Sequence, residues 1–407
     1  MLTYEYTAHD PSSGKRVKAK VEAETISAAS SLIKKQGLTP IEIKSDSSLS
    51  GFKKFLNRIS TKDKILFSRQ LATLIGAGLP IVQALRSSGE QSPSKPFKAI
   101  INSIIGSVEA GSSLSEAFAK YPKVFNQIYI NLVAAGETSG TLDKALERLA
   151  TQQEKDAEIV SKVRGAFAYP IIVLFVMGLV LGFMVVKVLP AVGTLYNSLP
   201  GAQLPLITRI LLDFANFGTH YWWIVLIVFV VTVILTTRWA RTLGGKKVID
   251  RIKMRIWPIG PLFMKIYMAR FARTSSTLIS SGVPLLQVLE ITAGAINNIL
   301  IEKSLKTAME KVKGGKALSD AISKDPNFLP LVSNMIRIGE QSGTIEQMME
   351  RVAIYYETEV DNEIKTVSTL MEPILMVILG VLAFIIVAAV LLPIYGLAGN
   401  SSFTSGT

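Results

Sequence analysis

The sharpest polar feature of the sequence is a short motif, Gly-Glu-x-Ser-Gly-Thr, which occurs at residues 136–141 and again at residues 339–344. Its carboxylate and hydroxyl groups could bind a charged partner or another copy of the chain, but one glutamate per copy offers too few oxygens for a cation. Its glycines also permit a positive φ at a helix end, and Ser or Thr could cap the next helix. Both interpretations remain open. The candidate interaction residues are Arg69, Gly136, Glu137, Ser139, Gly140, Arg273, Gly339, Glu340, Ser342 and Gly343.

Catalysis has no candidate group in this chain. The two histidines, His9 and His220, are expected on opposite sides of a membrane, and there is no cysteine. Phosphate-loop, dinucleotide, serine-hydrolase and zinc-protease motifs are missing from the sequence. We therefore expect a protein that is not an enzyme, with no catalytic residue, cofactor or metal. If it does work driven by ATP, another chain must hydrolyse the nucleotide.

A long internal repeat surrounds each copy of the polar motif. Residues 67–85 read FSRQLATLIGAGLPIVQAL, and residues 271–289 read FARTSSTLISSGVPLLQVL. The match continues through the motif and ends at Pro170 and Pro373, each of which opens a long apolar run. A duplication of this length indicates a whole folded unit rather than a short solenoid repeat. The repeated unit is therefore a soluble module together with the segment that enters the membrane.

Each repeat predicts a bundle of helices. Gly136 and Gly140 are expected to bracket a turn, after which Leu142–Lys162 forms a long charged helix that runs into the first apolar segment. Arg69 and Arg273 head apolar stripes, where we expect ion pairs between packed helices. A separate acidic stretch precedes the last apolar segment and could face a basic partner or simply solvent. Its members are Glu357, Glu359, Asp361 and Glu363.

Three apolar segments are long enough to cross a membrane. They are residues 166–186, residues 221–237 and the run that begins at Pro373. A helix rises 1.5 Å per residue, so about 20 residues span the roughly 30 Å of hydrocarbon in a bilayer. The first 25 residues contain no apolar signal core, so no cleaved export peptide is expected.

The excess of basic residues, a net charge of +13, indicates topology rather than nucleic-acid binding. Lys and Arg cluster beside the apolar segments, and no aromatic-interleaved groove motif accompanies them. By the positive-inside rule, residues 1–165 and 238–372 are cytoplasmic, while residues 190–220 and the uncharged tail face outward. Two parallel repeats need one extra crossing between them, and residues 221–237 supply it.

The predicted fold is an all-α membrane protein with two tandem cytoplasmic bundles, duplicated in parallel, three transmembrane helices and a small N-terminal α+β module. That module has strands at Leu2–Thr7, Val17–Val21 and 41–43, and a helix from Thr25 or Ser27 to Lys35. The expected divisions are 1–44 (module), 45–60 (linker and amphipathic segment), 61–165 (first bundle), 166–190 (first span), 191–220 (outer loop), 221–237 (second span), 238–260 (basic linker), 261–372 (second bundle), 373–397 (third span) and 398–407 (tail).

These blocks together resemble a known family, the inner-membrane platform proteins of type II secretion and type IV pilus machines. The likeness covers essentially the full chain. It rests on the two repeat openings and on LPLITR, GETSGTLDKALERLA, WPIGPLFMKIYMARFART, GEQSGTIEQMMERVA and MEPILMVILG. The resemblance implies a duplicated six-helix cytoplasmic domain with three spans in the bacterial inner membrane. It marks the Gly-Glu-x-Ser-Gly loops and the Arg-led helices as signature positions.

The resemblance also implies partners. They are a cytoplasmic hexameric ATPase, pilin or pseudopilin transmembrane helices, other inner-membrane assembly subunits and further copies of the same chain, with no nucleic acid. The platform would couple the ATPase to insertion of pilin subunits into a filament. The alternative is a subunit of an oligomeric channel or transporter. That alternative predicts polar positions along the spans, whereas the apolar stretches hold no charged residue.

Overall fold

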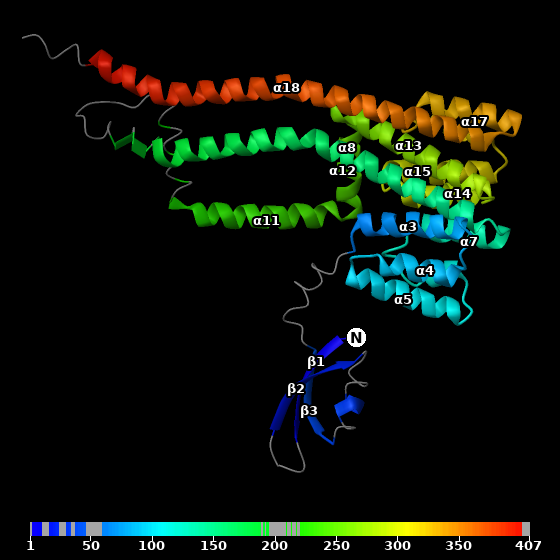
Figure 1. The fold of residues 1–407 in the computed structure, drawn as a ribbon. Helices are drawn as coiled ribbons and strands as arrows, with labels where there is room; N and C mark the ends of the chain where they lie inside the picture. Colours follow the sequence, from blue (N-terminus) through cyan, green and yellow to red (C-terminus); the bar gives the residue numbers. More distant parts are fainter. Residues whose placement is uncertain are drawn as a thin grey trace, which may run out of the picture.

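The computed structural model describes residues 2–9, 16–23, 30–33, 37–45, 59–188 and 220–400, with isolated positions between 190 and 217. Most of the predicted helix up to Lys35, the linker after Ser45, the outer loop and residues 401–407 lie outside the described residues. Figure 1 shows the shorter helices gathered at one end of the long apolar helices, which run roughly parallel to one another.

Three strands form an antiparallel sheet at the N-terminus: β1 (Leu2–His9), β2 (Arg16–Ala23) and β3 (Thr39–Ser45), in the order β2-β1-β3. A break in register between Thr7 and Ala8 shifts the pairing of β1 with β3. Tyr6 and Ala8 point to one face, as the two-residue period of a strand requires, and they pack with the buried side chain of Ile33. Residues 30–33 are helical.

The first bundle combines six helices: α3 (Thr61–Gly76), α4 (Ile81–Glu90), α5 (Lys95–Glu109), α6 (Leu114–Ala119), α7 (Gln127–Ser139) and the start of α8 (Leu142–Phe183). Polar caps set several of their N-termini. Ser113 and Glu116 form a reciprocal capping box at α6, and the Asn126 side chain accepts from the Tyr129 amide at α7. The core is rich in aromatic side chains, and Phe118 and Phe125 contact each other at a tilt of 43° with ring centroids 4.5 Å apart.

The second bundle repeats this plan with α13 (Ile259–Ser280), α14 (Leu285–Ala295), α15 (Ile299–Lys313), α16 (Leu318–Ile322), α17 (Pro330–Ser342) and the start of α18 (Ile345–Asn400). Phe271 and Phe328 meet edge to face in its core. The two bundles have separate apolar clusters, but four side chains of the second bundle join the cluster of the first: Leu278, Val283, Val288 and Ile291.

Two helices continue from the bundles into apolar segments long enough to cross a membrane. One is α8 with the π-helical turn η1 (Met184–Val188), and the other is α18. Neither Pro170 nor Pro373 ends its helix, although each lacks the amide hydrogen that would bond the carbonyl four residues earlier. The charged helix predicted at Leu142–Lys162 therefore does run unbroken into the first apolar segment.

The predicted second span corresponds to α11 (Trp222–Ala240), which is apolar and turns by 92° into α12 (Leu243–Arg255). The described residues thus contain two helices that could cross a membrane, and three if this bent pair counts as one span. Most of the region expected to be a basic linker, 238–260, is helical, because Thr242 caps α12 by accepting from the Gly245 amide at 3.1 Å.

Candidate functional site

Arg273 ties the first helix of the second bundle to the long helix that leaves it. From α13 its Nε donates to Glu357 Oε1 at 2.8 Å and its Nη1 to Glu350 Oε1 at 2.5 Å, both on α18. Burial alone would lower the pKa of Arg273, but the two carboxylates outweigh it and raise the pKa. The guanidinium is therefore a charged clamp between α13 and α18.

Arg69 makes the matching clamp in the first bundle. Its Nε donates to Glu154 Oε1 at 2.7 Å, and its other nitrogens reach Glu147 and the Thr151 hydroxyl on α8. The bond from Arg69 lowers the pKa of Glu154. Both arginines therefore form the interhelical ion pairs expected from the sequence, and they do so at equivalent places in the repeat.

Glu137 and Glu340 bind inside their own bundles. The carboxylate of Glu137 accepts from the Leu114 and Ser115 amides at 2.5 and 3.0 Å, at the N-terminus of α6. Glu340 accepts from the Leu318 and Ser319 amides at 2.6 and 3.2 Å, at the N-terminus of α16. Each carboxylate satisfies amides that no helical carbonyl can reach and neutralises the positive helix end. These glutamates therefore join a short helix to the motif within each bundle.

The four glycines of the motif divide into two roles, and one prediction about them is wrong. Gly140 and Gly343 end α7 and α17 with φ of 69° and 72°, as expected for a left-handed cap. Gly136 lies inside α7 instead of bracketing the turn. A Cβ there would stand 2.7 Å from Ala145 Cβ, so glycine is required by close packing of α7 on α8. A Cβ at Gly339 would lie 2.8 Å from the Ile345 Cα.

The motif serines do not cap the next helix. Ser139 Oγ donates back to the Ala135 carbonyl at 2.7 Å, and Ser342 Oγ donates to the Ile338 carbonyl at 2.7 Å. Thr141, the residue before α8, makes no capping bond with its side chain. Both serines are exposed, and the loops they occupy lie at the ends of α8 and α18 farthest from the apolar segments (Figure 1).

The acidic stretch on α18 meets cations of the same chain, which neither interpretation of the sequence anticipated. Lys162 of α8 donates to Asp361 Oδ2 at 2.7 Å, and Lys265 of α13 reaches Glu359 and Glu363 at 2.9 and 2.6 Å. The bonds to Asp361 and Glu158 raise the pKa of Lys162. We call this group the clasp. It joins α8, α13 and α18 just before the apolar segments begin.

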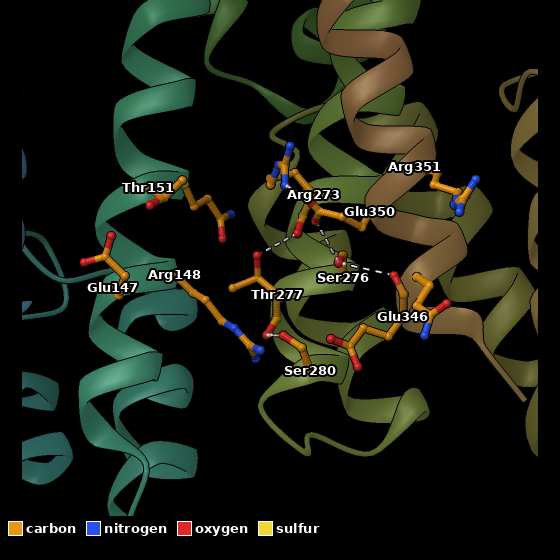
Figure 2. A pocket seen from close by; sticks show the side chains of 12 residues that line it. Glu147, Arg148, Thr151, Arg273, Ser276, Thr277, Ser280, Glu346, Glu350 and Arg351 are labelled. Carbon is orange, nitrogen blue, oxygen red and sulfur yellow. Dashed lines mark hydrogen bonds and ion pairs between the residues drawn. The ribbon is translucent and has the colours of Figure 1, made fainter. Parts of the chain in front are cut away.

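The two bundles meet where α13 packs against α8. The buried Gln152 side chain of α8 donates to Thr274 Oγ1 at 2.8 Å, and Arg270 donates to Asp156 at 3.1 Å. Beside them is a polar cavity of about 470 Å³. Figure 2 shows Arg148 and Thr151 of α8 facing it from one side and Thr277 of α13 from the other. Within the described ranges, no three carboxylate or histidine side chains gather as a metal site would require.

Sequence reasoning missed both the clasp and the junction between bundles. The spacing of the acidic residues did contain a signal for the clasp. Glu359 and Glu363 are four residues apart and share one helix face, and Glu357 and Asp361 share another. Two acidic faces on one helix indicate two basic neighbours. The junction left no such signal, because Gln152 and Thr274 are uncharged residues in charged and apolar surroundings.

Sequence comparisons match the two repeats and the N-terminal region. The sequence model of the family described as "Type II secretion system (T2SS), protein F" matches residues 67–190 and again residues 271–393. The model described as "Type II secretion system protein F, N-terminal domain" matches residues 1–44. The two larger matches each contain most of one bundle and the helix that leaves it.

Relatives with similar sequences extend over nearly the whole chain. The type IV pilus assembly protein PilC of Thermus thermophilus is 37% identical over 412 residues, covering 99% of this chain and 100% of the relative. PilC of Myxococcus xanthus is 35% identical over 390 residues, covering 95% and 93%. The type II secretion system protein F of Vibrio cholerae is 32% identical over 401 residues, covering 97% and 98%. The chain belongs to the type II secretion system protein F family, which includes these pilus assembly proteins.

Proposed function

We propose that this protein is the inner-membrane platform of a type IV pilus or type II secretion machine. In this role it couples a cytoplasmic hexameric ATPase to the insertion of pilin or pseudopilin subunits into a filament. The relatives named for type IV pilus assembly and for type II secretion support this role, and so does the duplicated bundle-plus-span design. The protein acts by binding and movement rather than by catalysis.

The observation that carries the coupling is the continuity of α8 and α18. Each helix starts inside a packed bundle and continues through its apolar segment as one helix, although Pro170, Pro373 and Pro393 lack an amide donor and η1 is a π-turn. The clasp joins the two helices at the point where they leave the bundles. A force applied to the bundles therefore moves the membrane segments as one body.

The proposed topology has three spans, a cytoplasmic N-terminus and an outward C-terminus, with the divisions expected from the sequence. In it α11 returns the chain between the two parallel repeats. The 92° bend then lays α12 along the cytoplasmic membrane surface. Its exposed basic residues Lys247 and Arg251 lie on the same helix face as the exposed Leu243, and we place that face against the anionic headgroups.

The ATPase contact is proposed at the two exposed loops that carry Ser139 and Ser342. Glu137 and Glu340 position these loops from inside the bundles. The loops lie at the ends of the long helices farthest from the membrane, where a cytoplasmic hexamer has access. The N-terminal module and further copies of the chain complete the set of proposed contacts within the machine.

Co-purification tests this function. The full chain is extracted in a mild detergent together with the assembly ATPase encoded in the same organism, and the retained ATPase is quantified. We expect retention by the wild type and loss in the double variant Ser139→Arg/Ser342→Arg. The control Thr307→Arg adds one arginine at an exposed position on α15 and retains the ATPase. Wild type that retains no ATPase, while filaments still depend on both proteins, contradicts direct coupling.

A further inference from the structure

Apart from the packing of the equivalent helices α8 and α18 on each other, the contact between the two bundles is one-sided. α14 packs on α7 and α13 packs on α8, so the second bundle offers one face and the first bundle receives it. Within the described helices, the reciprocal pairs, α4 with α17 and α3 with α18, make no comparable contact. Since the bundles are repeats of each other, each chain keeps one unused copy of the offering face, on α3–α4, and one unused copy of the receiving face, on α17–α18.

The unused α3–α4 face retains the apolar character of its counterpart but is less covered. On α13–α14, Leu278 is fully buried and Val283 is 8% exposed. Their repeat equivalents in the first bundle, Leu74 and Leu79, are both only partly buried. Leucine thus stands at both positions, packed against the core of the first bundle but less covered than its counterpart in the second.

The unused α17–α18 face shows the same difference more strongly. Tyr355 of α18 is 50% exposed, whereas its equivalent Gln152 is 4% exposed beneath α13. Ile338 of α17 is 48% exposed and stands where the first bundle has Ala135. Both positions therefore carry large apolar side chains that are about half exposed in the second bundle.

A polar pair that crosses the contact at its exposed edge is duplicated residue for residue. Gln287 of α14 donates to Asn131 of α7 at 3.4 Å within the chain. The repeat equivalents are Gln83 on α4 and Asn334 on α17, and both side chains are exposed. The ion pair from Arg270 to Asp156 is not duplicated. Leu66 replaces the arginine, and the equivalent carboxylate is already paired within the chain.

We propose that the α3–α4 face of one chain packs on the α17–α18 face of a second copy, with Gln83 against Asn334, in the geometry that joins the two bundles within a chain. This interface deepens the proposed function, because it specifies how copies of the platform assemble. The contact is heterologous, so it joins chains head to tail, and closure gives a ring. Both repeats send their long helices in the same direction (Figure 1), so repeating the internal relation keeps every membrane segment parallel in one bilayer.

Cysteine cross-linking in native membranes tests the interface, and the chain contains no cysteine to interfere. The double variant Gln83→Cys/Asn334→Cys is treated with a short bis-maleimide and resolved on a denaturing gel. We expect a ladder of dimers and larger species. Co-expressed single variants are expected to give dimers only. Asn131→Cys/Gln287→Cys must link within one chain and serves as the positive control, and Gln83→Cys/Lys313→Cys serves as the negative control.

Two results overturn the interface. One is the absence of links between chains while the positive control reacts. The other is a dimer formed by Gln83→Cys alone, which requires a symmetric contact.

A substitution provides a second measurement: Ile338→Arg is expected to reduce the mass of the detergent-solubilised assembly, and Thr307→Arg is not. Filament assembly without the ladder removes this interface and leaves the proposed function standing. A ladder of cross-linked chains without ATPase retention leaves this interface standing and contradicts the proposed coupling to the ATPase.

Discussion

The duplication allows the two arginine clamps to serve as controls for each other. Arg273→Met and Arg69→Met each remove a guanidinium from the first helix of a bundle and keep a side chain of similar length. Arg273 is 14% exposed and its partner Glu357 is 16% exposed. Arg69 is 30% exposed, and its partners Glu154 and Glu147 are 41% and 56% exposed. The second clamp is therefore much better shielded from water than the first.

The expected costs follow from that difference. Breaking a fully buried pair costs about 3–5 kcal/mol, and an exposed pair contributes about 0.2–1 kcal/mol. Because one partner, Glu350, is 44% exposed, we expect Arg273→Met to cost about 2–3 kcal/mol. Arg69→Met should cost about 1 kcal/mol after solvent screening. A free-energy change of about 1.4 kcal/mol alters an equilibrium constant tenfold. In Arg273→Met, the equilibrium constant for opening of α13 and α18 should therefore rise about 30- to 150-fold.

Hydrogen exchange of the full chain in detergent measures this opening segment by segment. The expected result is fast exchange in α13 and the N-terminal part of α18 in Arg273→Met, with a smaller change in α3 and α8 in Arg69→Met. Adding Glu357→Leu to Arg273→Met should restore part of the protection, because it removes the orphaned charge. Equal effects of the two arginine substitutions, or no rescue, refute the assignment of the clamp energies to burial.

Three further predictions use the same readout. Gly339→Ala places a Cβ 2.8 Å from the Ile345 Cα and should cost about 1–3 kcal/mol, while Gly106→Ala, with open space around its Cβ, should be neutral or stabilising. Glu340→Gln should cost about 1–2 kcal/mol and speed exchange at the Leu318 and Ser319 amides, unlike Glu346→Gln on an exposed turn. Ion pairs lower the pKa of Glu154 and Glu359 below the ordinary 4.5, so their stabilisation is complete above that pH and is lost as the pH falls through the lowered values. Exchange in α8 and α18 that accelerates already near neutral pH contradicts this sign.

The repeat allowed most of the fold to be predicted, because its two copies share matching residues at a fixed sequence offset. Pro170 and Pro373 aligned the two apolar segments, and the lack of a partner for residues 221–237 indicated the returning helix. The position of Gly136 was wrong for a physical reason. A glycine can be required either because the backbone adopts a positive φ or because two segments approach closely. Only the packing of α7 against Ala145 shows that the second reason applies to Gly136.

The site was predicted less completely than the fold. The ion pairs of Arg69 and Arg273 followed from their place at the head of apolar stripes. The partners of Glu137 are backbone amides, and those have no sequence signature. The junction between bundles depends on which of two equivalent faces is used, and the differences between the two copies of the repeat do not by themselves indicate the choice. Which face is used is decided by tertiary packing, and it became visible only from the contact between Gln152 and Thr274 in the structure.

The central claim is that continuous helices transmit movement from the bundles to the membrane. The most direct test inserts Gly-Ser-Gly-Ser after Arg164 in α8 and after Thr369 in α18, between the clasp and the apolar segments. The control inserts the same residues after Gln91, in the loop between α4 and α5. Filament assembly is counted by electron microscopy, alongside membrane insertion and ATPase retention. The account predicts normal insertion and retention with no filaments in the double insertion, and filaments in the control. Normal filaments in the double insertion would contradict it.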